Sequence, residues 1–168
     1  MDTERTNRIK NIMRESGIDI LVCRLPENIL YLSGYWSVFG SSCIIFPLDG
    51  EPVLILPYPE LDYAAEGWVR DQRTYRFINM NALANPPASI LKIMKEVWEE
   101  KGYADTVVGY EGSFDLVAGN NVAAEARVPS FLTLNNMFDS FTANKWVDAT
   151  PQIKKARIIK SSQEIEQL

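Results

Sequence analysis

The side chains that most often carry catalysis are sparse in this sequence, whose 168 residues include two cysteines and no histidine. Without histidine the chain cannot form the usual histidine-containing zinc sites, and Ser-His-Asp and Cys-His catalytic arrangements are excluded. Two cysteines cannot make a four-thiolate zinc site. Carboxylates alone could hold magnesium or manganese, but no carboxylate constellation is recognisable. We therefore predict no catalytic residue, metal ligand or cofactor in this chain.

A second group of side chains indicates recognition rather than catalysis. Tyr35, Trp36 and Phe39 crowd a Gly- and Ser-rich stretch that also contains Ser41. Large apolar side chains in such a loop reduce solubility unless something covers them. Two interpretations stay open: these residues face a substrate or a partner, or they are buried within the domain. We take the four as candidate substrate- or partner-facing residues.

Strands on either side must hold this loop in place. Pro26 suits a first helical position and predicts a single helical turn, which Ser33 and Gly34 end. After the loop, Asp49-Gly50 between two apolar runs predicts a tight hairpin, because Gly supplies the positive φ of the turn. The predicted strands around these features are Ile18–Cys23, Cys43–Phe46 and Val53–Leu56.

The rest of the chain predicts alternating helices and strands. Helices are expected at Asp2–Ser16, from Pro57 to near Gly67, at Asn85–Lys101, at Asn120–Ala126 and at Phe131–Phe138. Strands are expected at Thr74–Ile78, Thr106–Tyr110 and Trp146–Ala149. Pro151–Lys160 predicts a helical turn, and Ser161 with Glu164 predicts a capping box that starts a last helix. The prediction is a three-layer α/β domain whose mixed sheet of five to six strands has helices on both faces.

Charge and composition limit the classes of partner and indicate the cellular compartment. The formal charge is −5 and the sequence pI is about 4.8, so we predict no nucleic-acid partner and no anionic membrane partner, since both need a concentrated basic face. We see no signal peptide and no apolar run long enough for a membrane span. Cys23 and Cys43 lie in apolar runs and are expected to be reduced core residues of a cytoplasmic protein, with a disulfide or a reactive thiol as the alternative.

Two motifs carry a family resemblance. The first is Asn28-x-x-Tyr31-Leu32-Ser33-Gly34 followed by a strand and an Asp-Gly hairpin, and the second is Arg157-x-x-Lys160-Ser161-x-x-Glu164-Ile165. Together they resemble the amino-terminal domain of the creatinase, prolidase and aminopeptidase P family, and Val108-Gly109-Tyr110-Glu111 resembles a strand end of that family. The resemblance implies a ribonuclease H-like arrangement, with structural roles for Asn28, Tyr31, Ser33, Gly34, Arg157 and Lys160. It also implies a domain at 1–155 and the start of a linker helix at 156–168.

The same resemblance implies a function for a longer parent protein. Family members cleave Xaa-Pro peptides with two divalent metal ions (Mn, Co or Zn), held by two Asp, one His and two Glu of a carboxyl-terminal domain. That domain is absent from this sequence, and the last helix is too short to be stable alone, so we expect a fragment. The family also implies a homodimer in which the Tyr35–Ser42 loop borders the neighbouring active site. Ser41-Ser42 after Phe39-Gly40 lacks the basic residue of creatine-hydrolysing members, which favours short proline-containing peptides as substrates.

Two further functions stay open. The parent could be a catalytically dead peptidase-like protein in which this domain is a binding module. Alternatively, the chain could be a free-standing α/β domain that binds a small molecule. Residues downstream of Leu168 would separate these possibilities, because the five metal ligands are either present or absent there.

Overall fold

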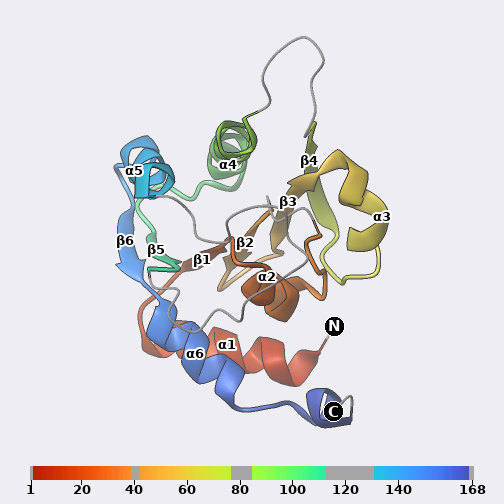
Figure 1. Cartoon of the computed structure of the whole chain (residues 1–168). Coiled ribbons are helices and arrows are strands. Elements are labelled where there is room, and N and C mark those ends of the chain that lie inside the picture. Colours follow the sequence, from red (N-terminus) through yellow and green to blue (C-terminus); the bar gives the residue numbers. More distant parts are fainter. Residues whose placement is uncertain (1, 39–41, 77–84, 113–130, 167–168) are drawn as a thin grey trace.

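The computed structural model describes residues 2–38, 42–76, 85–112 and 131–166, which form a six-stranded mixed sheet with helices on both sides (Figure 1). The strand order is β4-β3-β2-β1-β5-β6. β2 pairs antiparallel with both β1 and β3, whereas the β1–β5, β5–β6 and β3–β4 pairs are parallel. The strands are β1 Ile20–Cys23, β2 Cys43–Pro47, β3 Val53–Pro57, β4 Asp71–Tyr75, β5 Val107–Tyr110 and β6 Lys145–Asp148. The predicted α/β fold with a mixed sheet is confirmed.

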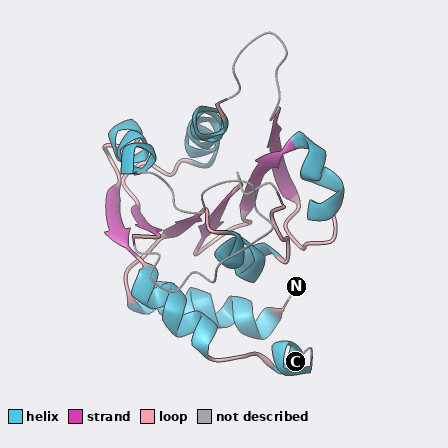
Figure 2. Ribbon diagram, viewed as in Figure 1, coloured by secondary structure: helices cyan, strands magenta, loops and turns pink. Residues whose placement is uncertain are grey.

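The helices lie in two layers, one on each face of the sheet (Figure 2). The first layer contains α1, α2, α3 and α6, and the second contains α4 and α5. Their bounds are α1 Thr3–Glu15, α2 Pro26–Ser33, α3 Leu61–Ala64, α4 Pro86–Lys101, α5 Phe131–Ser140 and α6 Thr150–Ile158, with a 3-10 turn η1 at Tyr58–Glu60 and a terminal helix α7 at Ser162–Glu166.

Central strands β1, β2 and β3 are apolar along their whole length because both faces are covered. Alternate residues enter opposite halves of the core. Leu21 and Ile44 pack toward α1, α2 and α6, whereas Val22 and Ile45 pack toward α4 and α5. In the helix predicted at Asn85–Lys101, Met94 and Trp98 belong to the core, since the two side chains are 0% and 6% exposed.

The helix boundaries have local causes. The Asp2 side chain accepts from Arg5 N and caps α1, and the Asn85 side chain accepts from Ala88 N and caps α4. Pro26 stands at the start of α2 as predicted, and Gly34 ends the helix with φ +77°. A side chain at Gly34 would be strained in that left-handed conformation.

Several predicted boundaries were wrong. The strand placed at Thr74–Ile78 is β4, Asp71–Tyr75, because pairing with β3 outweighs the low β-propensity of its polar first residues. The single helical turn at Pro26 is an eight-residue helix, and the turn at Pro151–Lys160 is the nine-residue helix α6. The helix predicted at Asn120–Ala126 lies outside the described residues, as does the end of the predicted strand at Ile78.

Both cysteines are buried and free, one on each face of the sheet. Burial raises the pKa of the Cys23 thiol well above its usual range and the pKa of Cys43 to about 12. None of the helices in the described part of the chain is long and apolar enough to cross a membrane.

Candidate functional site

A buried carboxylate at the end of β5 organises the first polar cluster. Glu111 is 4% exposed. Its oxygens accept hydrogen bonds from the backbone N–H of Arg24 at 2.7 Å, from that of Leu25 at 3.1 Å, and from Nδ2 of Asn28 at 2.6 Å. Glu111 therefore ties the end of β5 to the start of α2, next to the end of β1.

The two motifs meet at this cluster. Nη1 of Arg157 in α6 donates to Oδ1 of Asn28 at 2.9 Å, so both ends of the Asn28 amide are used. Three N–H groups reach the two Glu111 oxygens, and the Leu25 N–H is shared between them. A carboxylate bonded in this way holds segments of the fold together. Burial raises the pKa of Glu111, and the N–H donors and the Arg24 charge oppose that rise.

The other residues of the first motif also serve the fold. The Tyr31 hydroxyl donates to the Ala156 carbonyl at 3.1 Å and links α2 to α6. Ser33 Oγ donates to the Ile29 carbonyl at 2.6 Å and accepts from Tyr35 N at 3.0 Å, which shapes the chain as it leaves α2.

A second buried carboxylate, Glu60 of η1, holds the aromatic loop. Its Oε2 accepts from the Tyr35 hydroxyl and from Val38 N, the latter at 2.8 Å. Ser37 and Ser42 are hydrogen-bonded through their hydroxyls at 3.1 Å, and the Tyr35 hydroxyl lies 3.3 Å from Ser42 Oγ. Burial and the hydrogen bond to Glu60 raise the pKa of Tyr35.

The structure separates the candidate residues of this loop. Tyr35 is 1% exposed and belongs to the core, which is the burial alternative stated above, whereas Trp36 is 38% exposed. Phe39 and Ser41 lie outside the described residues. Glu60 holds the Tyr35 side chain and the Val38 backbone N–H, so Trp36 lies at the surface between two residues that are anchored to the same carboxylate.

The second motif fastens the carboxyl-terminal segment to the start of α1. Lys160 Nζ donates to the Arg157 carbonyl at 2.6 Å, and Ser161 and Glu164 form the predicted capping box, with N-to-side-chain distances of 2.8 and 3.1 Å. Ser161 Oγ is hydrogen-bonded to the Asp2 carboxylate, and Ser162 N donates to Glu4 at 3.0 Å.

The same segment exposes three apolar side chains. Ile158, Ile159 and Ile165 are 76%, 57% and 61% exposed, although the segment is tied down at its backbone. A groove of about 670 Å³ runs beside it, with Arg5, Leu30, Trp68, Arg70 and Glu164 in its lining. The surface here offers apolar area next to charged groups of both signs.

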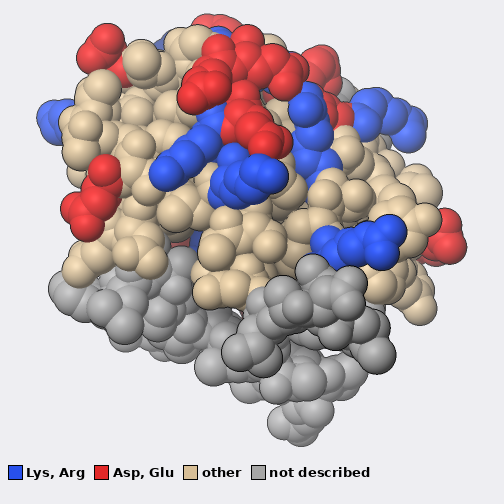
Figure 3. Space-filling model, turned by 90° about the horizontal axis from the view of Figure 1, so that it is seen from above, with Lys and Arg blue, Asp and Glu red and all other residues tan. Residues whose placement is uncertain are grey.

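The described residues offer neither a cluster of metal ligands nor, on the face in Figure 3, a concentrated basic patch. No group of three or more His, Cys, Asp or Glu side chains that could hold a metal ion occurs within residues 2–38, 42–76, 85–112 and 131–166. Over the described part of the face shown in Figure 3, acidic and basic side chains are interspersed. One such mixed network joins Asp71, Arg73, Glu100 and Lys101 across β4 and α4.

Sequence reasoning missed three of these groups. Glu111 was noted only as part of a strand-end resemblance, and Glu60 and Arg24 were not singled out. For Glu111 and Arg24 the available signal was a charged residue directly after an apolar strand. For Glu60 it was a carboxylate within the Pro-rich start of a helix.

Comparisons with known proteins agree with this architecture. The family model described as the Creatinase/Prolidase N-terminal domain matches residues 5–159. An ectoine hydrolase of Halomonas elongata is 25% identical over 162 residues, covering 95% of this chain and 38% of the relative. Among solved structures, a prolidase from Thermococcus sibiricus aligns with a TM-score of 0.66 at 16% identity, covering 99% of this chain and 39% of the other. A prolidase from Pyrococcus furiosus gives 0.59 at 23%, covering 95% and 40%. The chain thus spans about two fifths of these proteins' lengths.

Proposed function

The chain belongs to the creatinase/prolidase N-terminal domain family, and on that premise we propose that it is the non-catalytic amino-terminal domain of a metal-dependent hydrolase. The observation that carries the proposal is the junction of the two motifs at Asn28 and Arg157. That junction holds α6 against α2, and the hydrogen bonds of Ser161 to Asp2 and of Ser162 to Glu4 hold the start of α7 against α1.

The proposed role is to contribute dimer contacts and part of the wall of the substrate site. Trp36 supports it, because a half-exposed aromatic on a loop braced by Glu60 is suited to contact a second surface. Phe39 and Ser41 are proposed to share this role. The exposed Ile158, Ile159 and Ile165 are proposed to be covered by the catalytic domain of the same full-length chain.

The metal chemistry is assigned to that catalytic domain. Two divalent ions, Mn, Co or Zn, held by that domain would activate the attacking water and polarise the scissile carbonyl. The described residues of this chain do not offer a matching ligand set, so no step of the reaction is routed through them. We propose short proline-containing peptides as substrates and a cytoplasmic location.

A second substrate class has a specific observation in its favour. The curated relative is an ectoine hydrolase, an enzyme named for a small cyclic substrate rather than a peptide. The same domain could therefore form the wall of a site for a compact zwitterion. A catalytically dead parent that uses the fold as a binding module, or a free-standing domain, remains the alternative outside hydrolysis.

The test compares the full-length protein with residues 1–168 alone. Each is assayed with an Xaa-Pro dipeptide and with ectoine, with and without added manganese or cobalt. We expect metal-dependent turnover by the full-length protein only, and the preferred substrate decides between the two classes. Turnover by rigorously purified residues 1–168 would overturn the non-catalytic assignment, and an inactive full-length protein would favour the binding module.

A further inference from the structure

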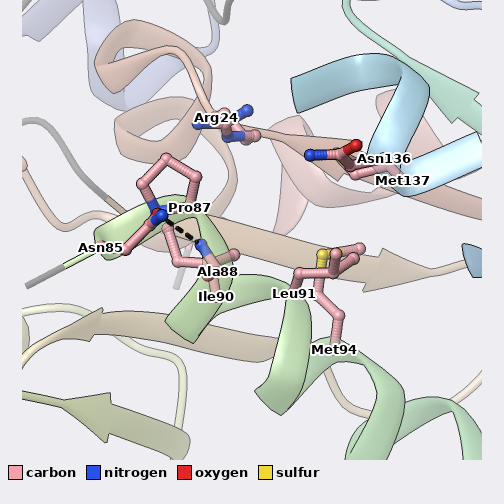
Figure 4. Close-up of a pocket in the computed structure, with 9 residues that line it drawn as sticks. All are labelled: Arg24, Asn85, Pro87, Ala88, Ile90, Leu91, Met94, Asn136 and Met137. Carbon is pink, nitrogen blue, oxygen red and sulfur yellow. Dashed lines mark hydrogen bonds between the residues drawn. The ribbon is translucent and has the colours of Figure 1, made fainter. Parts of the chain in front are cut away.

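A cavity of about 100 Å³ lies between the end of β1 and helix α4. Figure 4 shows Arg24 at one end of it, with Pro87 on one side and Asn136 on the other. Its walls are largely apolar and include Ile90, Leu91, Met94 and Met137. The cavity is on the α4 and α5 side of the sheet, and Glu111 links its Arg24 to the junction of Asn28 and Arg157, since it accepts from the backbone N–H of Arg24 and from Nδ2 of Asn28.

The charged group in this cavity is incompletely satisfied. Nε and Nη1 of Arg24 are buried and have no hydrogen-bond partner among the residues that the structure describes. A guanidinium is always charged and carries five N–H donors. In folded proteins the great majority of buried N–H donors have a hydrogen-bond partner. An arginine placed in this way is suited to an acceptor that enters from outside.

Neighbouring groups do not meet this need. Glu111 is close enough for the Arg24 charge to affect its pKa, yet its oxygens are taken by N–H groups, including the backbone N–H of Arg24 itself. The first backbone N–H groups of α4 add no donor for a ligand, since Pro86 and Pro87 have no N–H and Ala88 N is bonded to Asn85 Oδ1, the dashed line of Figure 4.

The position of the cavity in the sheet agrees with a ligand site. β1 and β5 are parallel neighbours, and the chain builds β2, β3 and β4 on one side of β1 before it crosses to β5 on the other. Open α/β sheets bind ligands outside the carboxyl ends of strands, at the point where the strand order reverses. Arg24 directly follows the carboxyl end of β1 at this point.

We propose that this cavity binds a small monocarboxylate with a short aliphatic body. A carboxylate matches one edge of the planar guanidinium with two parallel hydrogen bonds, from Nη2 together with either Nε or Nη1. The single guanidinium favours a ligand with one carboxylate rather than two, and the apolar walls would enclose a body of a few carbon atoms. The inference goes beyond the proposed function and does not depend on it.

The test is a titration of residues 1–168 with sodium acetate and sodium isobutyrate, followed by the NMR signals of the Arg24 Nε–H and of the Ala88 and Leu91 amides. Sodium chloride at equal ionic strength and isobutyramide serve as ligand controls. Arg24→Gln removes the charge in the cavity. Lys92→Gln is the matched variant, because it removes an exposed cation of α4, the helix that lines the cavity.

We expect saturable shifts with isobutyrate, which the amide and chloride do not reproduce. Arg24→Gln should weaken binding by about tenfold or more, the loss expected for a charge-assisted hydrogen bond, while Lys92→Gln should change it by less than about twofold. The proposal is overturned if the shifts do not saturate, if chloride gives the same shifts, or if Arg24→Gln binds as tightly as the parent chain. An Nε–H signal that is already displaced and does not respond to isobutyrate would show that the chain's own groups or water fill the site, and would also overturn it.

Discussion

The Arg157 guanidinium donates to the Asn28 side-chain oxygen at 2.9 Å across 129 positions of sequence. The nitrogen of the same amide donates to Glu111 at 2.6 Å. One asparagine thus joins α2, α6 and the end of β5. Because Asn28 uses both ends of its amide, removing it takes the acceptor from Arg157 and leaves Glu111 with only the backbone N–H groups of Arg24 and Leu25.

Asn28→Ala should therefore lower the free energy of unfolding by about 2 to 3 kcal/mol, since it leaves both Arg157 and Glu111 short of a partner in a buried site. The midpoint of urea unfolding at an unchanged slope measures the effect. Asn11→Ala is the matched control, because Asn11 also accepts from an arginine but at the exposed surface. In a double-mutant cycle with Arg157→Ala, we expect a coupling of about 1 kcal/mol or more. Additive effects of the two changes would contradict the proposed junction.

Glu111 should give the unfolding free energy a specific pH dependence. Its folded pKa is raised above the ordinary value of 4.5, so between the two values the folded state binds more protons than the unfolded state. The contribution of Glu111 to stability is then full below the ordinary pKa and is lost as pH rises through the folded pKa.

Comparison with Glu111→Gln isolates this contribution, because the amide does not titrate. We expect the stability of the parent chain, relative to the variant, to fall as pH rises from about 4 toward neutrality. Asp2, Asp71 and Asp148 have lowered pKa values and act in the opposite direction, but they are common to both proteins and cancel. A relative stability that grows with pH would mean that the hydrogen bonds to Glu111 outweigh its burial.

Trp36→Ala should show whether Trp36 contributes to the stability of this domain or to contacts with a second surface. With 38% of Trp36 exposed, we expect a loss of about 1 kcal/mol or less in residues 1–168, against about 3 to 5 kcal/mol for Trp98→Ala in the core. In the full-length protein, Trp36→Ala should reduce turnover or dimerisation, while Tyr58→Ala, an exposed aromatic on η1, should not. Equal effects of Trp36→Ala and Tyr58→Ala on turnover and sedimentation would argue against a role at an interface.

Cys23 and Cys43 should react slowly with a thiol reagent in the native protein. Burial raises both pKa values, so little thiolate is present at neutral pH and access is blocked. After denaturation without reductant, both thiols should be titrated. Rapid labelling of the native chain, or no thiol after denaturation, would contradict the buried free cysteines.

Much of the fold could be predicted from local signals. Continuous apolar runs located β1, β2 and β3, and Asn85 followed by two prolines located the start of α4, because burial and capping leave direct marks in sequence. β4 was placed too late because its first residues are polar and its strand character comes from pairing with β3. α2 was made too short because the end at Gly34 was recognised but the helical extent between Pro26 and Gly34 was not.

The candidate site was harder to predict than the fold. Motif spacing identified Asn28 and Arg157 separately, but their contact depends on how α2 and α6 pack and has no local signature. The loop aromatics were grouped by type, although Tyr35 points at a buried carboxylate from η1 and Trp36 does not. Arg24 could not be identified from the sequence either. It stands out because Nε and Nη1 are buried without a partner among the described residues, which depends on how the surrounding elements pack.

The hydrogen bond between Ser161 and Asp2 joins the two ends of the described chain on one side of the sheet. The described ends of the chain lie together beside α1 and α6, while α4 and α5 stand on the opposite side of the sheet (Figure 1). A segment that continues from Glu166 would begin on the side of the molecule that carries α1 and α6. The opposite side, which includes the cavity at Arg24, would then remain accessible to a separate ligand.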